Sequence, residues 1–97
     1  MYEVRIKKKA LKNLQTMPKE IQFLFDSLVD DLIEKGPIRK EWPNFSALGK
    51  NQYHCHLSYK WIACWYYENN SVKIEVYYAG SRENAPYWNY NKRRYSS

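Results

Sequence analysis

Two histidines one residue apart, His54 and His56, are the side chains of this sequence best suited to moving a proton. In a β-strand, residues i and i+2 share a face, so both imidazoles point to one side and Cys55 to the other. The three side chains therefore cannot close around one ion, and no metal or other cofactor is expected. On an open sheet face the histidines can act as general acids or contact phosphate, and the plainer alternative is a pair of solvated strand histidines.

A second group of reactive side chains follows Gly80, where the sequence pattern of the last strand breaks down. Arg82 can hold a phosphate through two parallel hydrogen bonds and stabilise charge that develops in a transition state. Tyr87 lies five residues further on, and its phenol can exchange a proton where nearby cations lower its pKa. A helix-capping arginine and a core tyrosine fit the same spacing, so the sequence leaves both interpretations open.

Charge and aromatic content favour a nucleic-acid partner. The formal net charge is +6, and the 97 residues include ten Tyr and four Trp, more rings than one small core can bury. Phosphates attract basic surfaces, and exposed rings stack on unpaired bases. The chain has no Gly-rich phosphate loop, no Ser-His-Asp set and no apolar run of membrane-spanning length. We expect a single soluble, cytoplasmic domain without a disulfide framework.

Hydrophobic periodicity predicts the elements that position these residues. A short strand and a short helix come first, and a second helix runs from Pro18 to the Gly36-Pro37 stop. A loop follows, and then three aromatic-rich strands joined by tight turns. Two helices packed on one face of a four-stranded, mainly antiparallel sheet give an α+β domain whose other face stays free. In residue numbers, the strands are expected at 2–7, 53–57, 61–67 and 72–79, the short helix at 8–15 and the loop at 37–50.

The two cysteines are predicted to lie in the core. If Tyr59-Lys60 is a two-residue turn, Cys55 and Cys64 fall opposite each other on neighbouring strands. In a reducing compartment they are expected to behave as two small buried hydrophobic side chains.

Basic residues also gather near both termini. The run from Arg5 to Lys12 is best explained as a solvated face. Residues 88–97 combine Lys92-Arg93-Arg94 with Trp88, Tyr90 and Tyr95, which predicts a basic, aromatic C-terminal tail after a single domain at 1–87.

The order of elements and three short motifs resemble the RelE/ParE superfamily of toxins from type II toxin–antitoxin systems, and within it the HigB/RelE-like branch. Leu48-Gly49-Lys50 precedes the first strand of the meander, Gly80-Ser81-Arg82 ends the last strand, and a short segment leads to Tyr87. The resemblance spans residues 2–87 and implies a RelE-like β-α-α-β-β-β toxin domain. It also implies a cognate antitoxin partner.

The resemblance implies an mRNA interferase, a metal-independent endoribonuclease that cuts mRNA in the ribosomal A site and so inhibits translation. Arg82 would stabilise the extra negative charge on the phosphate. Tyr87 would act as a general base or stack on a nucleobase. Lys50, His54 and His56 fall where the family places basic residues that hold phosphate or move protons.

The sequence departs from the family pattern where many members carry Tyr-Arg, because Lys60-Trp61 stands there. Lys60 supplies positive charge but not the planar, bidentate contact of arginine. We assign Lys50, Lys60 and Trp61 to RNA binding. A ParE-like inhibitor of DNA gyrase without catalytic activity is therefore the main alternative. A third possibility is a module that only binds single-stranded RNA by stacking.

Overall fold

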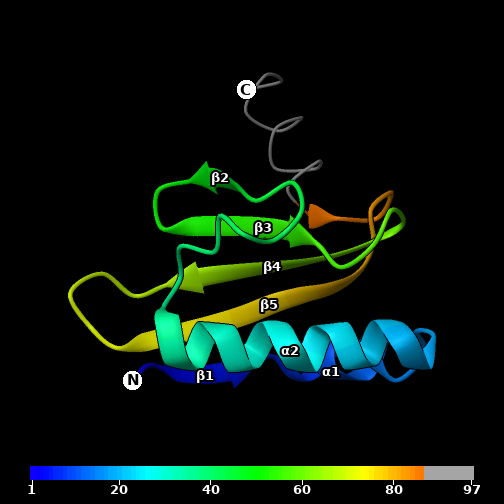
Figure 1. Ribbon diagram of the computed structural model, residues 1–97, viewed down its shortest axis with the longest axis horizontal. Coiled ribbons are helices and arrows are strands. Elements are labelled where there is room, and N and C mark those ends of the chain that lie inside the picture. The colour runs from blue at the N-terminus through cyan, green and yellow to red at the C-terminus, as the bar shows by residue number, and fades with distance from the viewer. Residues whose placement is uncertain (87–97) are drawn as a thin grey trace.

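The computed structural model describes residues 1–86 and shows one mixed sheet covered by two helices (Figure 1). Its strands are β1 Glu3–Ile6, β2 Ser46–Gly49, β3 Gln52–His56, β4 Trp61–Tyr67 and β5 Lys73–Ser81. Their order across the sheet is β1-β5-β4-β3-β2, with β1 parallel to β5 and the other pairs antiparallel. The predicted α+β class is confirmed, but the sheet has five strands rather than four.

The helices are α1 Lys8–Leu14 and α2 Lys19–Lys35, within a residue of their predicted bounds. Gly36 ends α2 at φ 94°, a backbone conformation that favours glycine. A Cβ at Gly36 would also lie 2.7 Å from the ring of Tyr2, so glycine is required there for space as well. The buried side chains of α2 recur at helical spacing and form one face against the sheet: Ile21, Phe25, Leu28 and Leu32.

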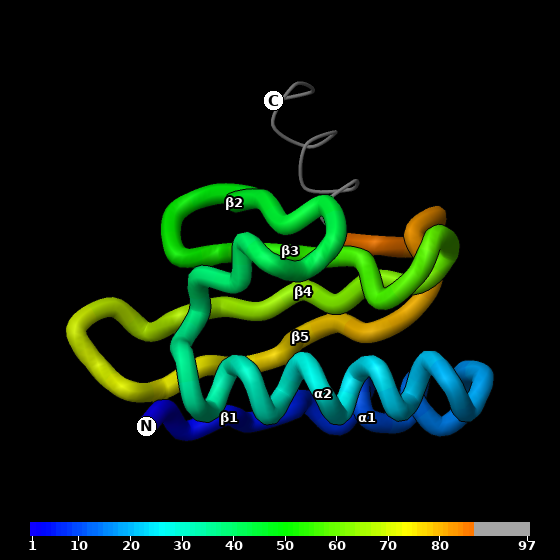
Figure 2. The backbone as a smooth tube through the Cα atoms, viewed as in Figure 1, coloured from blue at the N-terminus to red at the C-terminus, as the bar shows by residue number. Residues whose placement is uncertain are grey.

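The connection after α2 crosses the helix-covered side of the sheet to reach β2 at the far edge (Figure 2). On its way it places Phe45 against Tyr53 and Trp65, with ring centroids 5.7 and 6.0 Å apart. Trp65 is fully buried, and its indole N–H donates to the carbonyl oxygen of Pro37 at 3.0 Å. A segment without helix or strand therefore completes the core.

Replacing Trp65 with alanine is expected to lower the free energy of unfolding by about 3–5 kcal/mol, because the change empties the centre of the core. Trp65→Phe keeps most of the packing but leaves the Pro37 carbonyl without its donor, so we expect a smaller loss of about 1–3 kcal/mol. Urea denaturation measures both values. Tyr66→Ala, at the partly exposed neighbour of Trp65, is the control. It should lower the free energy of unfolding by less than Trp65→Phe does.

Strand β2 lies inside the segment 37–50 that we predicted to be a loop, and that part of the prediction is wrong. Ser46 and Ala47 are exposed, so no alternation of buried and exposed side chains marks the strand. Its pairing with β3 also shifts register between Ala47 and Gly49. Asn51 at φ 60° makes the turn that brings β2 back along β3. The strand therefore depends on a partner rather than on its own sequence.

The predicted pairing of Cys55 with Cys64 is also wrong, although both side chains are buried as predicted. Cys55 faces Ala63 across the β3–β4 ladder, whereas Cys64 faces His54. The connection is longer than a two-residue turn, and the N–H of Leu57 donates to the carbonyl oxygen of Trp61. A shift of one residue sends the two thiols to opposite faces of the sheet. Burial raises the pKa of both thiols, that of Cys64 to about 12, so each remains a protonated, unreactive side chain.

The sheet face away from α2 carries His54 and His56, and we call it the histidine face. Our prediction that this face stays free is wrong at one end. β5 extends beyond the predicted Ala79 to Ser81, and the chain then turns back so that Ala85, 1% exposed, packs against Ile62 and Cys64. Within residues 1–86, no helix is long and apolar enough to cross a membrane.

Candidate functional site

His54 and His56 lie side by side on the histidine face, opposite Cys64 and Ile62 of β4. Their ring centroids are 5.7 Å apart. His54 is only 7% exposed, whereas His56 is partly exposed. The strand pleat therefore presents two imidazoles to the same surface, one held in the protein and one open to solvent.

The edge strand β2 contributes a direct partner to His54. Ser46 is the Cα partner of His54 across the β2–β3 ladder, and its Oγ lies 3.1 Å from the histidine Nδ1. The tautomer of the ring decides which of the two atoms donates. Sequence reasoning missed Ser46 because it lies in the segment predicted to be a loop.

Both histidines are held in the neutral form near neutral pH. Burial lowers the pKa of His54, a hydrogen bond that the imidazole donates to the main chain of Ser46 acts in the opposite direction, and the neighbouring charge of His56 lowers the pKa further. Burial also lowers the pKa of His56, and the positive charge of Arg82 adds to this effect. A neutral imidazole can accept a proton, so His56 is suited to act as a base.

Arg82 stands at the end of β5, next to the turn between β3 and β4. Its main-chain N–H donates to the carbonyl oxygen of Lys60 at 2.7 Å, which ties the two segments together. Its guanidinium carbon lies 5.0 Å from the ring centroid of Tyr59, a cation–π contact that holds an exposed side chain in place. Tyr59 is itself 77% exposed and was not predicted as a site residue. A tyrosine in a turn is too common a feature to signal this role.

The remaining predicted site residues do not all join this group. Lys50 lies in the turn before β3, at the opposite end of that strand from Arg82. Lys60 is exposed in the β3–β4 turn beside Arg82. Trp61 packs against the core on the other face of the sheet. Tyr87 and the tail 88–97 lie outside the residues that the structure describes.

The group formed by His54, His56 and Arg82 can bind a phosphate and take a proton from a neighbouring hydroxyl. The guanidinium supplies a fixed positive charge with two parallel donors, and the half-exposed imidazole supplies a neutral nitrogen. In the stretch 1–86, no three His, Cys, Asp or Glu side chains gather as ligands for a metal ion. The chemistry available to these residues is proton transfer and charge stabilisation.

Solved structures with the same arrangement of helices and strands include several toxins. The RelE–RelB complex from Pyrococcus horikoshii OT3 superposes with a TM-score of 0.69 at 21% identity, covering 87% of this chain and 98% of that one. The isolated E. coli RelE toxin superposes with a TM-score of 0.67 at 15% identity, covering 97% of this chain and 98% of that one. The YoeB–YefM complex from Staphylococcus aureus superposes with a TM-score of 0.63 at 10% identity, covering 82% of this chain and 95% of that one. Neither a protein-family model nor a curated protein matches the sequence.

These similarities show that the chain has the RelE-like toxin fold, as the sequence predicted. The coverage extends over most of each solved chain, so the likeness concerns the whole domain rather than one motif.

Proposed function

We propose that this protein is the toxin of a toxin–antitoxin system and that it cleaves messenger RNA on the ribosome. The observation that carries the proposal is the placement of two neutral histidines beside Arg82 at one end of a RelE-like sheet. A gyrase inhibitor that acts only by binding a protein has no need for a proton acceptor next to a phosphate-binding arginine.

In the proposed reaction, His56 accepts the proton of a ribose 2′-hydroxyl, and the 2′-oxygen attacks the adjacent 3′ phosphorus. The bond between the 2′-oxygen and phosphorus forms while the bond to the 5′-oxygen breaks. The 5′-oxygen takes up a proton and leaves as a hydroxyl, and the other product carries a cyclic phosphate. Arg82 binds the non-bridging oxygens and stabilises the extra negative charge. No step requires a metal ion.

His54 and Tyr87 complete the proposed catalytic set. His54, held by Ser46, is proposed to keep the surface beside His56 in place. Tyr87 is proposed to transfer a proton or stack on a base. Lys60, next to Arg82, is proposed to hold a neighbouring phosphate, and Lys50 a more distant one. Trp61 packs on the face away from the histidines, but it lines a pocket with Lys60 and Arg82, and there it is proposed to contact RNA.

We also propose a cognate antitoxin that silences the protein in the cytoplasm. The formal charge of +6 suits an acidic partner segment as well as RNA. Two of the similar structures are complexes, RelE–RelB and YoeB–YefM. The same fold therefore occurs in complexes with a second protein.

The experiment that tests the proposed function is induction in a bacterial host, followed by primer extension on two copies of one message. One copy is translated, and the other lacks a ribosome-binding site. We expect cuts only in the translated copy, because the ribosome presents the substrate. Growth arrest with an intact message would contradict the nuclease function and would direct attention to gyrase.

A further inference from the structure

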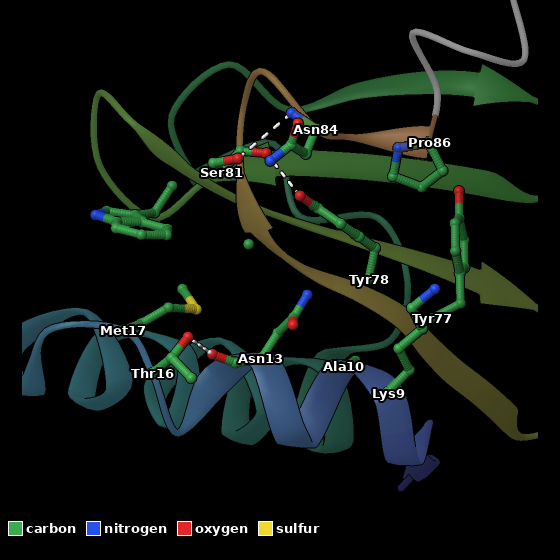
Figure 3. Close-up of a pocket in the computed structure, with 12 residues that line it drawn as sticks. Lys9, Ala10, Asn13, Thr16, Met17, Tyr77, Tyr78, Ser81, Asn84 and Pro86 are labelled. Carbon is green, nitrogen blue, oxygen red and sulfur yellow. Dashed lines mark hydrogen bonds between the residues drawn. The ribbon is translucent and has the colours of Figure 1, made fainter.

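A groove separate from the histidine pair runs between α1 and the second half of β5 (Figure 3). Its volume is about 680 Å³, which is within the range of small-ligand sites. β1 pairs only with the first half of β5, so α1 lies beside the second half and leaves this space. The residues that give the groove its chemistry are Lys9, Asn13, Tyr77, Tyr78, Ser81 and Asn84.

One wall of the groove is a tyrosine ring fixed in place by its neighbours. The hydroxyl of Tyr78 donates to the carbonyl oxygen of Ser81 at 2.7 Å. This bond brings the ring across Gly80, where an added Cβ would lie 2.7 Å from the Tyr78 hydroxyl oxygen. Glycine therefore leaves room for the ring, and a flat aromatic surface is in place before any ligand arrives.

An irregularity in the β4–β5 pairing adds a second ring. Cys64 pairs with Tyr78 and Trp65 with Val76, so Tyr77 is the extra residue of a β-bulge. The bulge lets both consecutive tyrosines line the groove, and the Tyr77 hydroxyl contacts Gln52 at 3.3 Å. Bulges re-aim side chains in this way next to binding sites.

The opposite wall is polar and its rim is basic. Asn13 of α1 points from the helix into the cavity, towards Tyr78 and Ser81, and Asn84 lies across from it (Figure 3). Side-chain amides carry both donors and acceptors and so match the edge of a base. Lys9 stands at the rim, and within the described chain no Asp or Glu lines the groove.

We propose that this groove binds one nucleobase of an unpaired RNA strand, next to the nucleotide whose phosphate Arg82 holds. The base stacks on the tyrosine wall, its edge meets Asn13, and Lys9 faces the backbone. Ser81 lines the groove and directly precedes Arg82, so the groove lies next to the proposed phosphate site. The inference rests on the proposed function only in taking RNA as the substrate.

The test is titration of the ¹⁵N-labelled protein with AMP, GMP, CMP and UMP, followed by NMR. We expect at least one nucleotide to shift the side-chain amide of Asn13 and the main-chain amides of Gly80 and Ser81. Asn13→Leu removes the amide and fills space, so it should weaken that binding by about tenfold or more. Gln15→Leu makes the same kind of change two residues along, outside the groove, and should leave the affinity unchanged.

The outcomes separate this inference from the proposed function. Shifts confined to His54, His56 and Arg82 would overturn the groove as a nucleotide site and leave the nuclease proposal standing. Shifts in the groove without any cleavage of mRNA in cells would support the groove and contradict the nuclease. If Asn13→Leu binds as tightly as the parent protein, Asn13 does not read the base and the inference fails. If none of the four nucleotides shifts a resonance of the groove, the inference is also overturned. The groove would then be tested as a binding site for a protein partner.

Discussion

Replacing Arg82 with alanine is expected to abolish growth arrest and to slow cleavage of translated message by at least about a hundredfold. The reason is that the guanidinium stabilises the charge added to phosphorus in the transition state, and no other arginine lies at this end of the described sheet. The side chain is exposed and its main-chain bond to Lys60 does not depend on it, so the fold should remain intact. Primer extension on the message and thermal unfolding of the purified variant measure the two effects.

Arg5→Ala is the matched control for Arg82→Ala. Arg5 is an exposed arginine on β1, at the other edge of the sheet from β2 and β3, and its loss changes the net charge equally. We expect Arg5→Ala to keep nearly full activity. The activity of Arg82→Lys should fall between those of Arg82→Ala and Arg5→Ala, because lysine retains the charge but not the planar pair of donors. If the Arg82→Ala variant is fully toxic, Arg82 has no role in the mechanism.

Replacing His56 with glutamine is expected to slow cleavage by about 10²–10⁴-fold, the usual contribution of a general base. The change retains the size and polarity of the side chain but removes the nitrogen that accepts a proton near neutral pH. His54→Gln should have a smaller effect, because His54 is buried and bonded to Ser46 rather than open to the substrate. Single-turnover cleavage on programmed ribosomes measures both rates.

The pH dependence gives a second measurement of the same prediction. Burial and Arg82 lower the pKa of His56 below its ordinary value of 6.5, so the imidazole is neutral and active at pH 7. Activity should therefore persist as the pH falls to 6.5 and decline only below it, as the imidazole takes up a proton. Arg82→Ala should move the midpoint of His56, followed by NMR, to higher pH. A rate that is independent of pH below 6.5 would contradict a histidine base.

Gln52→Ala is the control for the histidine substitutions. Gln52 precedes His54 by two residues on the same face of β3, and its side chain accepts a hydrogen bond from Tyr77 rather than facing Arg82. If Gln52→Ala slows cleavage as much as His56→Gln, the effect reflects disturbance of the sheet face and not loss of a base.

Much of the fold was predictable because its signals are local. The apolar residues of α2 recur every three or four positions, and Gly36 ends the helix for reasons visible in the sequence. The aromatic-rich strands β3, β4 and β5 also appeared near their predicted bounds. The alternation of side chains likewise predicted that His54 and His56 would share a face, because the pleat repeats every two residues.

The site depended on information that no local pattern contains. Ser46 reaches His54 only because β2 pairs with β3, and β2 has no alternation of its own to predict it. Arg82 is held by Tyr59, a residue 23 positions earlier, through a contact between a turn and a strand end. These partners are decided by which segments lie side by side in space.

The sequence by itself determined both helices, four of the five strands and their order, and the supply of histidine, arginine and aromatic side chains. Only the tertiary structure decided the strand register, which put His54 rather than Cys55 opposite Cys64. It also decided the return of Ala85 over the histidine face and the groove beside α1. The physical reason is that side-chain direction follows from each residue's own backbone, whereas register and coverage follow from loop lengths and from the packing of distant segments.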